Sequence, residues 1–285
     1  MALSSQLKRL INGVLAPANL QLGTLTASKV EYERLRRLAD RGHFERPAFP
    51  LLKSFSSLEG KVVTDAYAAY RQDIARLLAQ GEGPHRYDPD NEYFCPADAC
   101  PTYLIARSFK PATWFEVGSG NSTRVVRQAI EDGGLATRLI CVDPYPRAEV
   151  SSVADEMVRA EVQTLVPQSI ADRLDGNDVL FIDSSHQLKA GGDVPHLLLN
   201  VLPRLRPGVL VHIHDVFLPY DYPRDWVEER AWNEQYLVQA MLQFSAKFEV
   251  LWAGYYTQQS RPDVAAKLDF LTRGRPASLW LRVLD

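Results

Sequence analysis

Hydrophobic residues after position 112 gather in six short runs, and the stretches between these runs have helical spacing. The runs cover 113–118, 139–143, 179–183, 209–215, 248–254 and 277–284. Strand-length apolar runs that alternate with amphipathic stretches are typical of a parallel sheet whose two faces are both covered by helices. The pattern therefore predicts one doubly wound α/β domain over residues 111–285.

Three of the helical stretches have recognisable ends. One is expected to begin at 121 or 122 and to end at the glycine pair 133–134, and another to run from 193 to about 203. In the third, Asp225 and Glu228 have the spacing of a capping box, and apolar residues recur at every fourth position from 232 to 244. This spacing predicts a single helix.

The first 110 residues follow a different pattern. Helical spacing over 28–40 and 60–80 predicts two amphipathic helices, and a shorter one is expected near the N-terminus. Between 81 and 102, prolines, acidic residues and aromatic residues predict a long loop. Such loops are commonly lids or binding loops, although a linker packed on the next domain fits as well. We expect residues 1–110 to form a helical cap with a lid segment.

Charge and composition exclude several classes of partner. The 285 residues include 32 Lys and Arg against 35 Asp and Glu, so the chain lacks the positive field that holds a nucleic-acid backbone. No apolar run approaches the roughly 18 residues that a membrane-spanning helix needs. The cysteines, Cys95, Cys100 and Cys141, are too few for a disulfide framework. We expect a soluble cytoplasmic protein with no nucleic-acid partner and no membrane span.

Polar residues end the first two apolar runs, and the first of these ends is rich in glycine. The segment there consists of Glu116, Val117, Gly118, Ser119, Gly120, Asn121 and Ser122. Its glycines let the chain turn tightly and approach a ligand, and an acid at the next strand end, Asp143, can accept both hydroxyls of a ribose. This combination predicts a nucleoside ligand; a simple turn with a capping Asp143 is the alternative. A third glycine is missing where Thr123 stands, which disfavours a dinucleotide.

Acids and imidazoles follow the runs 179–183 and 209–215. Asp183 and His186 follow the first, and His214 and Asp215 end the second. Because neighbouring parallel strands end at the same edge of a sheet, these side chains are expected to converge, either as metal ligands or as acid–base groups. His212 shares a sheet face with His214 but lies deeper, so we expect a hydrogen-bonded core histidine there.

The motif at 116–122, together with Asp143, resembles motif I and the ribose-binding acid of the class I S-adenosylmethionine-dependent methyltransferases. The resemblance extends over about 92–284. It implies a mostly parallel, seven-stranded, Rossmann-like sheet with a reversed last hairpin, and S-adenosylmethionine as cofactor. The implied cofactor-binding residues are Glu116, Gly118, Ser119, Gly120, Asn121, Ser122 and Asp143, with the adenine near 166–169 and its Ser169.

The later strand ends are similar to those of the catechol O-methyltransferases, within the branch that methylates small molecules and sugars. Matched by position, the resemblance implies Asp183, His214 and Asp215 as ligands of a divalent metal, with His186 in the place of the catalytic lysine. An imidazole ligand suits zinc, iron or manganese better than magnesium. In the metal-free alternative, His186 is the catalytic base and Asp183 or Asp215 orients its ring.

The resemblance implies O-methylation of a small-molecule or sugar hydroxyl by the domain at 111–285. Two other functions fit part of the pattern: a nucleotide-dependent oxidoreductase, and a catalytically silent binding or scaffold protein of the same fold. The missing third glycine disfavours the oxidoreductase. The cluster of ionisable residues disfavours the scaffold alternative. Buried ionisable groups lower the stability of a fold, and a binding or scaffold protein does not need them for its function.

Overall fold

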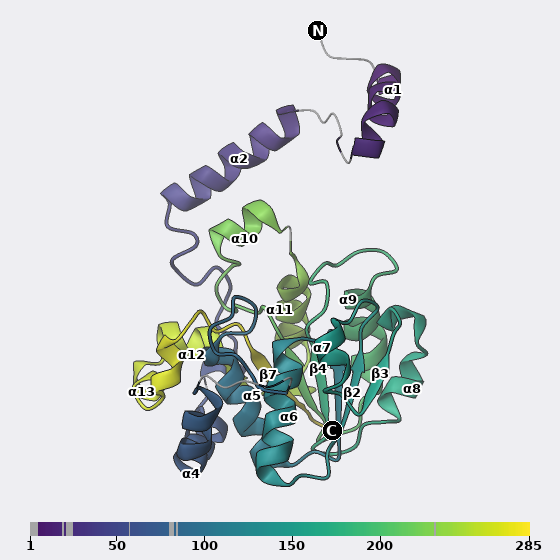
Figure 1. Cartoon of the computed structure of the whole chain (residues 1–285). Coiled ribbons are helices and arrows are strands. Elements are labelled where there is room, and N and C mark those ends of the chain that lie inside the picture. Colours follow the sequence, from purple (N-terminus) through teal and green to yellow (C-terminus); the bar gives the residue numbers. More distant parts are fainter. Residues whose placement is uncertain are drawn as a thin grey trace.

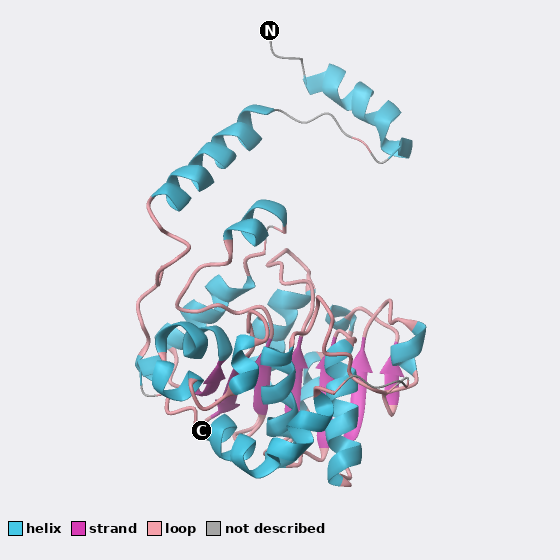
Figure 2. Ribbon diagram, turned by 60° about the vertical axis from the view of Figure 1, so that its left-hand side comes forward, coloured by secondary structure: helices cyan, strands magenta, loops and turns pink. Residues whose placement is uncertain are grey.

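The computed structural model describes residues 5–18, 20, 25–56, 58–79, 83, 85–230 and 232–285. Its centre is a seven-stranded sheet of order β3-β2-β1-β4-β5-β7-β6, in which β7 runs antiparallel to the other strands (Figures 1 and 2). The strands are β1 (Thr113–Val117), β2 (Arg138–Val142), β3 (Glu156–Val158), β4 (Val179–Ile182), β5 (Leu210–Ile213), β6 (Phe248–Ala253) and β7 (Leu279–Val283). The predicted doubly wound sheet with a reversed last hairpin is confirmed.

Helices cover both faces of this sheet. One face packs against α4 (Lys61–Leu77), α5 (Pro96–Phe109), α6 (Asn121–Gly133) and η5 (Asp269–Thr272). The other packs against α3 (Lys53–Ser56), α8 (Pro167–Ala171), η3 (His196–Val201) and α11 (Glu234–Phe244). Because both faces are buried, alternate residues of β4 pack into different apolar clusters. Phe181 packs into the cluster that includes α5 and α6, and Ile182 into the cluster that includes α8 and α11.

The remaining helical elements are short or lie outside the two layers. They are α1 (Ser5–Leu15), η1 (Ala16–Ala18), α2 (Leu25–Asp40), α7 (Ala148–Ser151), η2 (Val162–Thr164), α9 (Asp193–Pro195), η4 (Leu202–Arg204), α10 (Arg224–Glu229), α12 (Gly254–Ser260) and α13 (Pro262–Ala265). The helix expected over 193–203 is therefore a succession of α9, η3 and η4. Among the described residues, no helix combines the length and apolar character needed to cross a bilayer.

The N-terminal helices occupy two different places. α1 and α2 extend away from the sheet layers, and α2 approaches α10 (Figure 1). α4 and α5, in contrast, share one apolar cluster with α6 and β1. Part of the first 110 residues thus belongs to the core of the sheet domain itself.

The prediction of a loop over 81–102 is wrong from Pro96 onward, because α5 begins at this residue. Pro96 stands in the first turn of this helix, where backbone N–H groups have no hydrogen-bond partner within the helix. A proline, which has no N–H, is therefore tolerated there. The aromatic rings that suggested a lid are also largely interior: Tyr87 and Phe94 are buried, whereas Tyr93 is 69% exposed. Residues 81, 82 and 84 of this segment lie outside the described part.

The single helix expected from Asp225 to about 244 is also wrong, because the structure divides it into α10 and α11. At the junction, the backbone N–H groups of Asn233 and Glu234 donate to the carbonyl of His186 at 3.1 and 3.3 Å. Their partner lies far away in the sequence, so helical spacing alone could not reveal the interruption. The Glu228 side chain of the expected capping box lies outside the described part.

Candidate active site

A pocket of about 360 Å³ opens at the carboxyl ends of β1, β2 and β4. Ligands of open parallel sheets bind at this edge, and the volume lies in the range of small-molecule sites. The lining residues are Val117, Gly118, Val142, Asp143, Pro144, Glu161, Val162, Gln163, Asp183, Ser184, Ser185 and Asp193. The pocket therefore joins the predicted glycine motif and Asp143 to the first acid of the predicted catalytic cluster.

Gly118 is required where β1 passes the end of β4. Its φ of +86° lies in the region that favours glycine, and a Cβ atom built there would stand 2.0 Å from the backbone oxygen of Asp183. The Gly118 N–H donates to the carbonyl of Val142 at 3.0 Å. This close approach brings Asp183 directly beside the glycine motif.

Both carboxylate oxygens of Asp143 are held by neighbouring donors. The hydroxyl of Ser119 donates to Oδ2 at 2.6 Å, and the backbone N–H of Tyr145 donates to Oδ1 at 2.8 Å. Asp143 is half-buried and lines the pocket. The structure thus places an oriented carboxylate where the sequence predicts a ribose acceptor.

Other predicted cofactor residues lie behind the pocket. Glu116 is fully buried and accepts a hydrogen bond of 2.5 Å from the Ser122 hydroxyl, while the Cys141 thiol lies 3.5 Å from its second oxygen. Burial raises the pKa of Glu116 to about 8. The Gly120 N–H donates to the Thr123 hydroxyl at 3.0 Å. These contacts fix the start of α6, and neither Glu116, Ser122 nor Asn121 lines the pocket.

Ser169 is also not brought to the pocket. It is exposed on α8, and its hydroxyl donates to the carbonyl of Val166 at 2.7 Å. The wall on that side is formed instead by Glu161, Val162 and Gln163, which belong to or adjoin η2. The sequence pattern is too weak after β3 to distinguish these two neighbouring turns.

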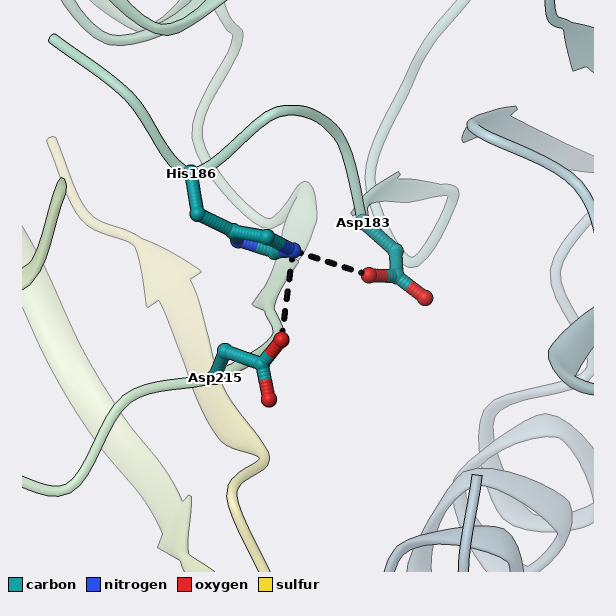
Figure 3. Close-up of side chains that lie close together, drawn as sticks. All are labelled: Asp183, His186 and Asp215. Carbon is teal, nitrogen blue, oxygen red and sulfur yellow. Dashed lines mark ion pairs between the residues drawn. The ribbon is translucent and has the colours of Figure 1, made fainter. Parts of the chain in front are cut away.

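The predicted acid and imidazole cluster is assembled beside the pocket. His186 Nε2 lies 3.3 Å from Asp183 Oδ1 and 3.2 Å from Asp215 Oδ2 (Figure 3). His186 and Asp215 both have φ of 57°, a left-handed backbone that costs energy in residues other than glycine. Such strain persists where the surrounding structure enforces it, and it concentrates at functional sites.

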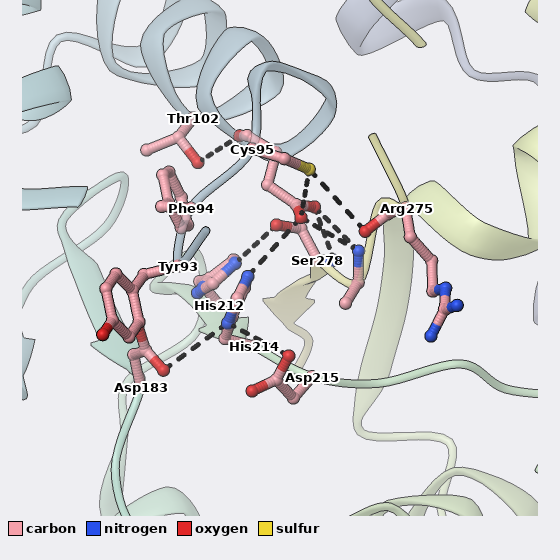
Figure 4. Close-up of polar contacts among 12 residues, drawn as sticks. Tyr93, Phe94, Cys95, Thr102, Asp183, His212, His214, Asp215, Arg275 and Ser278 are labelled. Atoms are coloured by element: carbon pink, nitrogen blue, oxygen red, sulfur yellow. Dashed lines mark hydrogen bonds and ion pairs between the residues drawn. The ribbon is translucent and has the colours of Figure 1, made fainter. Parts of the chain in front are cut away.

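His214 lies between this cluster and a carboxylate that the sequence analysis did not identify. Its Nδ1 is 3.5 Å from Asp183 Oδ1 and from Asp215 Oδ1 (Figure 4). Its Nε2 is 3.5 Å from Asp98 Oδ2. Asp98 is buried in α5 and accepts hydrogen bonds from the backbone N–H groups of Ala277 and Ser278. It stands inside the segment expected to be a loop, so no signal in the sequence marked it.

Opposing effects set the charges of the two histidines. Burial alone would lower the pKa of His186, but Asp183, Glu234 and Asp215 outweigh it and raise this pKa to about 10. Burial also disfavours the charge of His214, yet Asp215 and Asp183 raise its pKa well above the ordinary value. In the protein alone, both imidazoles therefore hold a proton at neutral pH.

Asp183 and Glu234 respond oppositely to this environment. Burial would raise the pKa of Asp183, but His214 and His186 hold it below its ordinary value. Burial does raise the pKa of Glu234, although His186 opposes the shift. Glu234 was not found from the sequence because it lies within the helix expected over that region.

His212 is a core residue, as predicted. Its ring stacks on Phe181 with 3.8 Å between centroids, and its Nε2 lies 3.0 Å from the Ser278 hydroxyl. Burial lowers the pKa of His212 well below the ordinary value. A neutral, stacked imidazole stabilises the sheet and stays out of the cluster chemistry.

Residues 115–216 of the chain match a family model described as a methyltransferase domain. The matched segment extends from β1 to the residue after Asp215, so it includes Gly118, Asp143, Asp183 and His186. No protein in the curated set of sequences matches the chain at a significant level.

Three solved structures are similar to the chain at low identity. An O-methyltransferase from Bacillus cereus in complex with SAH is 14% identical, with a TM-score of 0.39, covering 79% of this chain and 91% of the other. The SAH-bound methyltransferase PaMTH1 from Podospora anserina is 13% identical, with a TM-score of 0.42, covering 93% and 98%. A putative methyltransferase from Thermobifida fusca is 14% identical, with a TM-score of 0.43, covering 80% and 95%.

Proposed function

We propose that this chain, a methyltransferase by the domain that it carries, transfers the methyl group of S-adenosylmethionine to a hydroxyl of a small molecule or sugar. One observation carries the proposal: Asp183 lines the nucleoside-sized pocket and is also a member of the acid and imidazole cluster. A cofactor in the pocket and a hydroxyl at the cluster would therefore meet at the same side chain.

The chain's own residues suit the nucleoside end of the cofactor. The Asp143 carboxylate is the acceptor for the two ribose hydroxyls, and Ser119 and Tyr145 hold it in orientation. Gly118 lets the backbone approach the ligand without a side chain in between. The reactive sulfonium would then lie toward Asp183, at the border between pocket and cluster.

A divalent cation fits the donor set of the cluster. Asp183, His186 and Asp215 each offer one ligand atom, and these atoms lie within 4.8 Å of one another. Two carboxylate oxygens and one imidazole nitrogen suit manganese, iron or zinc better than magnesium. Bound there, such a cation would lower the pKa of an acceptor hydroxyl.

In this ligand set, His186 takes the place of His214, which the sequence analysis expected as the nitrogen ligand. Both ring nitrogens of His214 face carboxylates, Asp98 on one side and Asp183 and Asp215 on the other. We assign His214 the role of a buried positive charge that balances these acids. His186 provides the ligand nitrogen, because its Nε2 lies between Asp183 and Asp215.

The reaction then requires alignment and removal of one proton. The cluster holds the acceptor hydroxyl beside Asp183. The proton of this hydroxyl passes to His186 Nε2 once the imidazole has released its own proton, or to water when Nε2 is a metal ligand. The oxygen forms a bond to the methyl carbon, the bond from that carbon to sulfur breaks, and neutral S-adenosylhomocysteine leaves. Alignment of oxygen, methyl and sulfur supplies much of the rate, because the sulfonium is already reactive.

Transfer of a labelled methyl group tests this function. The protein is incubated with S-adenosylmethionine labelled in the methyl group and with fractionated cell extract, and the products are followed by mass spectrometry. We expect label in a small-molecule or sugar fraction, in a product that resists mild alkaline hydrolysis as an ether does. Label confined to protein or nucleic acid would contradict the proposal, as would the absence of any transfer.

A further inference from the structure

The junction between α10 and α11 contacts the loop that carries His186. Asn233 and Glu234 donate their backbone N–H groups to the His186 carbonyl, and the Asn233 side-chain oxygen accepts the N–H of Leu188 at 2.6 Å. His186 itself has the left-handed backbone, with φ of 57°. The interruption of the helix thus serves to hold a strained loop in place.

The same junction also fixes the His186 ring. Glu234 Oε2 lies 3.0 Å from Nδ1, on the side of the ring away from Asp183 and Asp215. The ring of Trp232 lies 4.5 Å from the imidazole, centroid to centroid, and the Arg230 guanidinium lies 4.6 Å from the Trp232 ring. The imidazole is therefore held at one nitrogen and packed against an aromatic ring.

Among the described residues, the Glu234 side chain has His186 as its one hydrogen-bond partner. Its side chain is only 1% exposed, and its second oxygen, Oε1, is buried with no hydrogen-bond partner in the part of the chain that the structure describes. Burying a carboxylate with half of its acceptors unsatisfied is costly. A carboxylate in the first turn stabilises a helix, but this role does not require the side chain to be buried against His186.

We propose that Glu234 is a positioning residue: by accepting the Nδ1–H of His186, it keeps Nε2 directed at the space between Asp183 and Asp215. This inference rests on the proposed function, because it explains how His186 is presented to the cation and the acceptor. A carboxylate behind a histidine ligand fixes the tautomer and the ring orientation, and its loss typically weakens metal affinity by about 10- to 100-fold.

Proton NMR of the metal-free protein, labelled with ¹⁵N in histidine, tests the contact itself. We expect a downfield Nδ1 proton of His186 that exchanges slowly with solvent in the native protein and disappears in Glu234→Ala. Glu131→Ala is the matched control, because Glu131 pairs with Nδ1 of the exposed His85 at 3.1 Å, far from the cluster in the sequence. The control should leave the His186 signal unchanged.

Calorimetric titration with Mn²⁺ tests the consequence. Glu234→Ala should weaken Mn²⁺ binding by about 10- to 100-fold. Glu234→Gln retains an oxygen that can accept from Nδ1, so it should keep the protected proton and recover most of the affinity. If Glu234→Ala does not fold, the inference is tested by whether Glu234→Gln keeps the protected Nδ1 proton of His186. S-adenosylhomocysteine affinity should be the same in all three proteins.

The inference is overturned if Glu234→Ala keeps the protected Nδ1 proton, or if it binds Mn²⁺ as tightly as the native protein. It is also overturned if Glu234→Gln loses that proton although it folds and binds S-adenosylhomocysteine normally. Failure of the proposed function would look different: the native protein would bind no S-adenosylhomocysteine, while the NMR comparison would still decide the role of Glu234.

Discussion

His186→Ala should lower kcat by roughly 10²- to 10⁴-fold, which is the usual effect of removing a positioned acid–base group. If Nε2 of His186 is a metal ligand, the variant should also lose the cation. The reason is that Nε2 of His186 lies between Asp183 and Asp215, at 3.3 and 3.2 Å, where the acceptor hydroxyl is to lose its proton. The affinity for S-adenosylmethionine should change little, because the imidazole does not line the pocket. Steady-state kinetics and calorimetry measure the two effects separately.

His85→Ala is the matched control for this variant, because His85 is an exposed imidazole paired with Glu131 on α6. It should leave kcat unchanged. If His186→Ala turned over like the native protein, the cluster would not be the site of proton removal. A parallel loss of cofactor affinity and kcat would assign His186 to binding instead.

Asp215→Asn should remove both the bound cation and turnover. The change takes away the charge of one of three candidate ligands, yet asparagine tolerates the left-handed backbone that this position requires. Elemental analysis should find a divalent metal in the native protein and little in the variant, and a chelator should abolish native activity. Asp225→Asn alters an exposed acid paired with Arg275 and is the control. This variant should keep both the bound metal and the native turnover.

The same site predicts a pH dependence for metal binding. The carboxylates raise the pKa of His186 to about 10, so below that pH a cation must displace a proton from Nε2. Apparent affinity for Mn²⁺ should therefore rise with pH, by about tenfold per unit between pH 6 and 8.

If the native protein contains no metal and its activity is insensitive to chelator, His186 acts as a base that must first lose its own proton. Activity should then rise with pH toward 10.

The sheet could be predicted from the sequence because its physical signal is local. Strands buried on both faces are mostly apolar, and the sequences of β1, β2, β4 and β5 have this character. Gly118 and Asp143 could be identified in the same way, since strand ends of parallel sheets are where ligands bind. The resemblance to methyltransferases, drawn from these residues, is confirmed by the match over 115–216.

The residues that the sequence did not reveal depend on contacts between distant segments. Asp98 matters because α5 carries it to the backbone of Ala277 and Ser278, and the prolines around it suggested a loop. Glu234 matters because its helix is interrupted to reach His186, which the helical spacing could not indicate. Glu116 stays a predicted cofactor residue; in the structure its side chain is buried and accepts a hydrogen bond from Ser122.

Calorimetric titration of S-adenosylmethionine into the native protein and into Asp143→Ala tests the central claim most directly. The variant leaves two ribose hydroxyls without their acceptor, which costs about 1 to 3 kcal/mol, or roughly 5- to 150-fold in affinity. Asp172→Ala, which removes an exposed acid next to α8, is the control and should bind like the native protein. The account predicts saturable binding that is weakened only in Asp143→Ala. No binding by the native protein, or equal binding by all three proteins, would contradict it.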